Sequence, residues 1–145
     1  MATPAPNVSL KSIRNETLQL QELQGKVVMV TFWASNCPSC LKEIPDLKSL
    51  YQDYHTKGLE LFAISMYYDR PNYVVEASKT YQIPYPIILD LRGGLAKSFG
   101  QVQLIPTTLL INTQGEIVYQ TTGLFNLSEM QQRIESLLPS QKGTL

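Results

Sequence analysis

The two cysteines of the chain, Cys37 and Cys40, are separated only by Pro38 and Ser39. They follow the apolar run 27–33 and open a segment with helical periodicity. At a helix start, free backbone N–H groups and the positive end of the dipole favour a thiolate, so Cys37 should be the reactive sulfur. Three residues of helix bring Cys40 beneath it, and such a pair can close and reopen a disulfide that carries two electrons. The spacing therefore predicts thiol–disulfide exchange, in which Cys37 attacks and Cys40 resolves.

Other uses of two cysteines fit the sequence less well. A structural zinc site needs four Cys or His ligands, and the chain adds only His55 to the pair. Covalent haem would need a histidine where Leu41 stands, and an iron–sulfur cluster would need more cysteines. A plain structural disulfide stays open as an alternative, although so short a loop gains little stability from closure. We expect no metal and no cofactor.

Length and charge exclude several classes of protein. The chain has 145 residues, 43% of them hydrophobic, which predicts one folded domain. Twelve Lys and Arg balance twelve Asp and Glu, so no basic field exists to bind nucleic acid. No apolar stretch reaches the length of a membrane-spanning helix, and residues 1–10 do not resemble a signal peptide. We expect a monomer.

The sequence pattern predicts an α/β fold with a mixed sheet covered by helices on both faces. We expect a flexible leader over 1–8, the domain over 9–138 and a flexible tail over 139–145. Buried strands are predicted at 27–33 and 59–65, with a helix over 37–54 between them, which favours a parallel pair. Further elements are predicted at 71–81, 85–89, 95–99, 107–111, 116–120 and from Asn126 onward.

Capping and turn residues support several of these boundaries. Asp69 could cap the helix at 71–81, and Gly115 could provide the positive φ of a hairpin between 107–111 and 116–120. Asn126 with Glu129 three residues later is typical of a capping box at the start of the last helix. Pro45 lies inside the first predicted helix and should kink it.

At this point the motifs match a known family. The run 32–40, FWASNCPSC, resembles the FWAxWCxxC signature of thioredoxin-like proteins. Pro45 matches the helix-kinking proline of that fold, and the segment 105–108, IPTT, looks like the one that carries its cis-proline. The upstream segment 18–26 and a strand–helix unit over 66–90 are similar to the TlpA/ResA-like branch. The resemblance implies a thioredoxin-like mixed sheet with a TlpA-type N-terminal extension and a central strand–helix insert.

The resemblance also implies a proton-transfer residue. Thioredoxin has a buried aspartate where this chain has Thr31, which cannot take a proton at working pH, so another base must serve Cys40. Glu43 lies three residues after Cys40, roughly 60° round the helix, where TlpA/ResA-like proteins carry an acid. We interpret Glu43 as the group that exchanges protons with the buried thiol; alternatively it is a solvated acid favoured by the helix dipole.

Substrate contacts are implied by the same match. Trp33, Pro38, Ile105 and Pro106 are expected to line the substrate site, with Pro106 in the cis form. Without the family match, a trans proline that opens an edge strand would be the simpler interpretation of Pro106. Trp33 is expected to pack in the core and to line the site at the same time. The asparagine at 36 replaces the usual tryptophan, and the Pro-Ser dipeptide departs from the common x-Pro, which leaves the redox potential open.

The resemblance implies a thiol–disulfide oxidoreductase that acts on protein thiols and disulfides. Members of this branch commonly act as reductants in the periplasm or on the outer face of a membrane, receive electrons from a membrane-embedded thiol transporter, and serve cytochrome c biogenesis and redox homeostasis. The alternatives are a disulfide donor of the same fold, a thiol peroxidase, and a non-catalytic binding module. Against the peroxidase, Ala34 stands where peroxiredoxins have Thr or Ser.

Five of the eight tyrosines fall between positions 67 and 85. Such amphipathic rings suit partner surfaces, but they could equally cover the sheet beside the inserted unit, which we expect.

Overall fold

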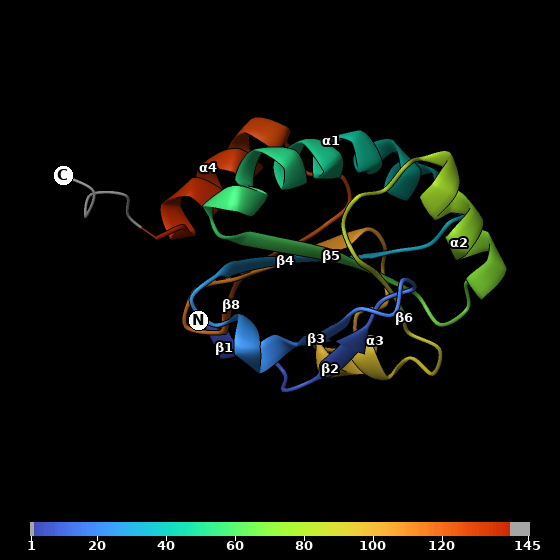
Figure 1. Cartoon of the computed structure of the whole chain (residues 1–145), viewed down its shortest axis with the longest axis horizontal. Helices are drawn as coiled ribbons and strands as arrows, with labels where there is room; N and C mark the ends of the chain where they lie inside the picture. Colours follow the sequence, from blue (N-terminus) through green and yellow to red (C-terminus); the bar gives the residue numbers. More distant parts are fainter. Residues whose placement is uncertain (1, 140–145) are drawn as a thin grey trace.

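A six-stranded mixed sheet forms the centre of the structure, in the order β1-β8-β7-β4-β5-β6 (Figure 1). The computed structural model describes residues 2–139. The strands are β1 Thr3–Pro4, β4 Val27–Trp33, β5 Leu59–Ser65, β6 Ile87–Leu89, β7 Thr107–Ile111 and β8 Glu116–Thr122. β4 is parallel to β5 and antiparallel to β7, so the strand at 27–33 lies mid-sheet, as its unbroken apolar sequence predicts.

Helices cover both faces of the sheet, which confirms the predicted α/β architecture. In Figure 1, α1 (Pro38–Tyr54) and α4 (Leu127–Leu137) lie above the sheet. α2 (Pro71–Thr80) packs with them, because its buried side chains join the same apolar cluster. The other face carries α3 (Gly94–Ser98), the hairpin of β2 (Ser9–Lys11) with β3 (Thr17–Gln19), and the 3-10 turn η1 (Leu20–Leu23). A second turn, η2 (His55–Lys57), follows α1.

Alternate residues of β4 supply both cores. Val27 and Met29 face the α1 side, whereas Val28, Val30 and Phe32 face the side of α3 and the β2–β3 hairpin. All seven residues of β4 are buried, so this strand is held from both sides. The four residues 34–37 lead from the end of this buried strand to the start of α1 at Pro38.

The expectation of a loose leader is wrong for residues 3–5. β1 pairs antiparallel with β8, and the N–H of Ala5 donates to the carbonyl of Gly115 at 2.9 Å. A short segment containing Pro4 fits there because β1 is an edge strand, where one missing N–H costs little. Of the predicted tail, all but Pro139 lies outside the described residues, and the domain limits 9–138 remain a prediction.

Local signals at the end of the chain are confirmed. The Asn126 side chain accepts a hydrogen bond from the N–H of Glu129 at 2.9 Å, so it is the N-cap of α4. Gly115 has φ +82° in the turn between β7 and β8. None of the helices in the described part of the chain has the length and apolar character needed to cross a membrane.

Candidate active site

The cysteine pair lies at the junction of β4 and α1. Cys37 is the N-cap of α1, and its Sγ accepts a hydrogen bond from the N–H of Cys40 at 3.2 Å. The two sulfurs form a disulfide, and their Cα atoms lie 5.2 Å apart. The predicted pairing at a helix start is therefore what the structure shows.

The two sulfurs differ in accessibility. Cys37 is half-buried, and its neighbour Pro38 is exposed as the first residue of α1, whereas Cys40 is only 3% exposed. An incoming group can therefore reach Cys37 far more readily than Cys40. The N–H of Cys40 and the helix dipole would both stabilise negative charge on Cys37 once the disulfide opens. The geometry suits Cys37 as the attacking sulfur.

A cis peptide bond joins Ile105 to Pro106, which confirms the predicted isomer. Thr107 pairs with Phe32 in the β4–β7 ladder, so the proline lies beside the end of β4. The segment 34–37, which we call the cysteine loop, begins at the same place and leads to α1. Pro106 is buried, and its carbonyl accepts a hydrogen bond from the N–H of Gly123 at 2.7 Å. Ile105 is half-buried beside it.

Glu43 is not the solvated first-turn acid of the alternative interpretation, because it is only 2% exposed. Its Oε2 accepts a hydrogen bond from the N–H of Phe125 at 3.1 Å, while Oε1 has no partner among residues 2–139. Burial is the main reason that the pKa of Glu43 is raised to about 7; the Phe125 hydrogen bond lowers it and the charge of Asp46 raises it further. A carboxyl with this pKa can both take and give a proton near neutral pH.

A small cavity of about 10 Å³ brings several predicted site residues together behind the disulfide. Trp33, Cys40, Glu43 and Pro106 line it, whereas Cys37, Pro38 and Ile105 lie outside it. It has room for about one water molecule. The indole Nε1 of Trp33, like Oε1 of Glu43, has no hydrogen-bond partner in the described part of the chain. Trp33, at 4% exposure, is part of the core and lines this cavity, while its contact with substrate stays a prediction.

Two of the other residues that line the same cavity carry hydroxyl groups. Thr31 is 1% exposed, at the position where a carboxyl would stand in thioredoxin, so Glu43 is the carboxyl that shares this space with Cys40. Tyr85 is buried opposite, and burial together with the charge of Glu43 raises the pKa of its phenol. The hydroxyl of Tyr85 therefore stays protonated, and the proton that can move at neutral pH is the one on Glu43.

Sequence reasoning missed the residue that holds the cysteine loop. Asp69 does not cap α2; its Oδ2 accepts the N–H of Ser35 at 2.6 Å and its Oδ1 accepts the Ser35 hydroxyl at 2.7 Å. Asp69 is 8% exposed, and Ser35 stands two residues before Cys37. An acid before Pro71 looks like a helix cap in sequence, and only its partner, 34 residues away, reveals the other role.

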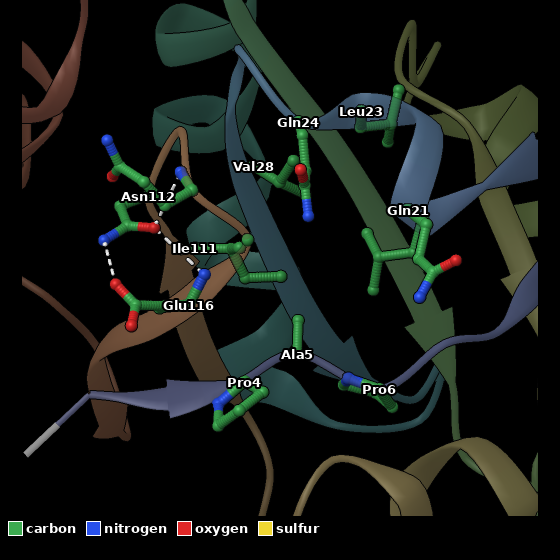
Figure 2. Close-up of a pocket in the computed structure, with 13 residues that line it drawn as sticks. Pro4, Ala5, Pro6, Gln21, Leu23, Gln24, Val28, Ile111, Asn112 and Glu116 are labelled. Atoms are coloured by element: carbon green, nitrogen blue, oxygen red, sulfur yellow. Dashed lines mark hydrogen bonds between the residues drawn. The ribbon is translucent and has the colours of Figure 1, made fainter.

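A larger cavity lies at the opposite end of the sheet (Figure 2). Its volume is about 310 Å³, and Pro4, Gln24, Val28, Ile111 and Glu116 are among its lining residues. Val28 is near the start of β4, whereas the cysteines follow the end of that strand, so this cavity is separate from the disulfide. Within residues 2–139, no group of three or more His, Cys, Asp or Glu side chains is placed to hold a metal ion.

Comparison with known proteins places this site in a family. The sequence profile of Redoxin matches residues 2–137. The chain belongs to the Redoxin family. The thiol-disulfide oxidoreductase ResA of Halalkalibacterium halodurans is 32% identical, over 93% of this chain and 76% of its own length. ResA of Oceanobacillus iheyensis is 34% identical, over 94% of this chain and 72% of its own. A thiol:disulfide interchange protein of the thioredoxin family from Chlorobium tepidum TLS superposes with a TM-score of 0.86 at 25% identity, covering 94% and 97% of the two chains.

These similarities confirm the expected thioredoxin-like fold and the resemblance to ResA-like proteins. This Redoxin-family chain is a thiol–disulfide oxidoreductase, and protein thiols and disulfides are its class of substrate. The peroxidase and disulfide-donor alternatives are not favoured, since the similar proteins are named as thiol-disulfide oxidoreductases.

The raised pKa of Glu43 predicts a pH-dependent stability. The pKa is about 7 in the folded state against an ordinary value of 4.5, so between these values the folded state holds the extra proton. Stability is then greatest below the unfolded pKa and falls as pH rises through about 7. We expect the oxidised protein to lose at most ~3 kcal/mol in free energy of unfolding from pH 5 to pH 8 through this group, measured by urea titration.

Glu43→Gln should flatten this pH dependence, because the amide does not ionise. Glu22→Gln, at an exposed position, is the matched control and should keep the wild-type profile. An unaltered profile in Glu43→Gln would contradict the raised pKa.

Proposed function

We propose that this protein reduces disulfides of polypeptide substrates outside the cytoplasm, in the manner needed for the maturation of c-type cytochromes, where the thiols of the apoprotein must be kept reduced. The observation that carries the proposal is the disulfide at the start of α1, with its outer sulfur accessible and its inner sulfur buried beside a carboxyl whose pKa is about 7. An accessible attacking sulfur and a protected resolving sulfur are what successive exchange steps require.

The first step forms a mixed disulfide. In the reduced protein, the thiolate of Cys37 attacks one sulfur of the substrate disulfide, the substrate S–S bond breaks, and the departing sulfur takes a proton from solvent. The N–H of Cys40, which contacts Cys37 Sγ at 3.2 Å, and the helix dipole stabilise the attacking thiolate.

The second step releases the product. Glu43 takes the proton from the Cys40 thiol, the Cys40 thiolate attacks Cys37 Sγ, and the bond between Cys37 and the substrate breaks. The second substrate sulfur leaves as a thiol after it gains a proton. Two electrons pass to the substrate, and the Cys37–Cys40 disulfide forms.

The substrate backbone would lie along the cis-proline turn. The N–H and C=O of Ile105 form no backbone hydrogen bond within the described residues, and such free groups can pair with an extended chain. Pro38 is exposed next to Cys37 and could contact the same substrate segment, whereas Trp33, at 4% exposure, would act from beneath the surface. Pro106 excludes a competing backbone N–H at this point, because proline has none.

The cycle requires an electron source. We propose that a membrane-embedded thiol donor reduces the Cys37–Cys40 disulfide after each turnover, that the protein works in the periplasm or attached to the outer face of a membrane, and that it acts as a monomer. The similarity to ResA proteins of Halalkalibacterium halodurans and Oceanobacillus iheyensis supports this placement.

Cysteine variants test the order of attack. Cys40→Ser should accumulate a mixed disulfide with a peptide disulfide, because the resolving thiol is absent, whereas Cys37→Ser should form at least about tenfold less adduct because Cys40 is only 3% exposed. Mass spectrometry of the quenched reaction measures both adducts. If Cys37→Ser formed the adduct and Cys40→Ser did not, the roles would be reversed.

Glu43→Gln tests the proton acceptor. The resolving step of the wild-type protein, followed by Trp33 fluorescence in a single turnover, should accelerate as pH rises through about 7, when the carboxylate forms. In Glu43→Gln this inflection should vanish, and the step should slow at least about tenfold at pH 8. Asp46→Asn is the matched variant: it removes a charge that raises the pKa of Glu43, so the inflection should move to lower pH and remain.

The midpoint potential of the Cys37/Cys40 couple tests the direction. Equilibration with redox buffers, followed through Trp33 fluorescence, should give a value near roughly −270 mV, typical of a thioredoxin-like reductant. A value near about −120 mV would indicate a disulfide donor and contradict the reductant proposal.

A further inference from the structure

Exposed apolar side chains gather at the edge of the sheet that carries the disulfide. The strand pairs Trp33–Ser65, Ser65–Leu89, Phe32–Thr107 and Thr107–Thr122 place the ends of β4, β5, β6 and β8 and the start of β7 at one edge. Most of the exposed large apolar side chains adjoin these strand ends. They are Tyr67 and Tyr68 after β5, Leu91 after β6, Leu104 before β7 and Leu124 after β8.

Three of them, Tyr67, Tyr68 and Leu91, form what we call the apolar ledge. They are 60%, 50% and 65% exposed. The rings of the two tyrosines meet edge to face with centroids 5.4 Å apart. The Tyr67 side chain packs on Gly93, where a Cβ would lie 3.6 Å from the ring, and Leu91 belongs to the same turn, which the N–H of Gly93 closes on the carbonyl of Asp90 at 3.1 Å.

Asp69 fixes this ledge to the cysteine loop. The residue directly after Tyr68 accepts both the N–H and the hydroxyl of Ser35, two residues before Cys37. A second bond runs from the N–H of Met66 to the carbonyl of Trp33 at 2.9 Å. The two loops are therefore bonded on either side of the tyrosine pair, and the ledge is held beside the disulfide. Buried apolar residues would stabilise the fold; rings exposed by half or more gain burial only from a partner.

The charges around the ledge favour an acidic partner. Both carboxylates near the ledge already have hydrogen-bond partners. Asp69 accepts hydrogen bonds from Ser35, and Asp90 is buried and accepts the N–H groups of Leu95 and Ala96 at 2.9 and 2.8 Å. The exposed charged side chains that follow these two acids are Arg70 and Arg92. The guanidinium of Arg70 lies 5.7 Å from the ring centroid of Tyr73. The exposed charges that flank the ledge in the sequence are therefore positive, although the chain as a whole has a net charge of zero.

We propose that the apolar ledge of Tyr67, Tyr68 and Leu91 docks the polypeptide segment next to the reacting cysteine of the substrate, and that it prefers an apolar side chain accompanied by a carboxylate, which Arg70 and Arg92 would pair. The inference rests on the proposed function, because it names the substrate class of that same site. It gives the protein sequence preference on the β5–β6 side of the disulfide, in addition to backbone pairing at the cis-proline turn.

The test compares three disulfides. Two are peptide–glutathione mixed disulfides that differ only beside the peptide cysteine, one with Leu and Glu and the other with Gly and Lys; the third is hydroxyethyl disulfide, which has no flanking chain. Reduction by the fully reduced protein is followed by Trp33 fluorescence, and the midpoint potential and circular dichroism of each variant are recorded.

The ledge variant is Tyr67→Ser/Tyr68→Ser/Leu91→Ser, and the control is Val118→Ser, at an exposed apolar position within β8. The ledge variant should reduce the Leu/Glu peptide about tenfold more slowly. It should keep the wild-type rate on hydroxyethyl disulfide and the wild-type potential, while the control keeps all three rates. Arg70→Glu/Arg92→Glu should reverse the preference between the two peptides.

Several results would contradict the proposal that the ledge docks substrate. One is a Leu/Glu rate within twofold of wild type in the ledge variant; another is an equal loss on hydroxyethyl disulfide, which would reveal a structural defect. A wild-type dimer that the ledge variant abolishes would assign the surface to a second copy of this chain. If the wild-type protein reduced none of the three disulfides, both the proposed function and the ledge proposal would be wrong. If the wild-type protein reduced them and the ledge variant did so at the same rates, only the ledge proposal would be wrong.

Discussion

The hydrogen bond from the N–H of Cys40 to Sγ of Cys37 reflects the constraint on which the site depends, namely that only four residues separate the start of a helix from a fully buried strand. The first N–H groups of any helix lack partners within it, and here a sulfur takes one of them. Because β4 is packed on both faces and paired on both sides, the helix start cannot shift without disturbing the core. The electrostatic advantage of Cys37 is therefore built into the backbone.

Burial gives Cys40 and Glu43 different roles from that of the more accessible Cys37. Cys40 and Glu43 lie on the inner side of α1, next to a cavity with room for about one water molecule. An ionised carboxylate there loses solvation, and the single hydrogen bond from Phe125 offsets only part of that loss. The protein thus keeps a carboxyl that is less stable when charged, and this property makes it a useful proton acceptor at neutral pH.

Much of the secondary structure was predictable because it depends on local sequence. The unbroken apolar run at 27–33, the Asn126 cap and Gly115 each specify a short-range geometry, and the structure shows all three. The β1 pairing was not predictable, because an edge strand of two residues has no periodicity of its own. The role of Asp69 was missed for a related reason: a carboxylate before a proline predicts a cap, and its true partner is distant in the chain.

The tyrosines show the limit most clearly. The sequence shows five of them between 67 and 85, but the structure buries Tyr85 to 2% exposure and leaves the other four exposed, against our expectation that they cover the sheet. The sequence by itself determined that a cysteine pair stands at a helix start and that the chain resembles thioredoxin-like proteins, since both follow from residue type and spacing. Only the tertiary structure decided which carboxyl is buried beside Cys40, which acid holds the cysteine loop and which rings face solvent. Those properties depend on contacts between segments far apart in the chain, and spacing along the sequence does not encode them.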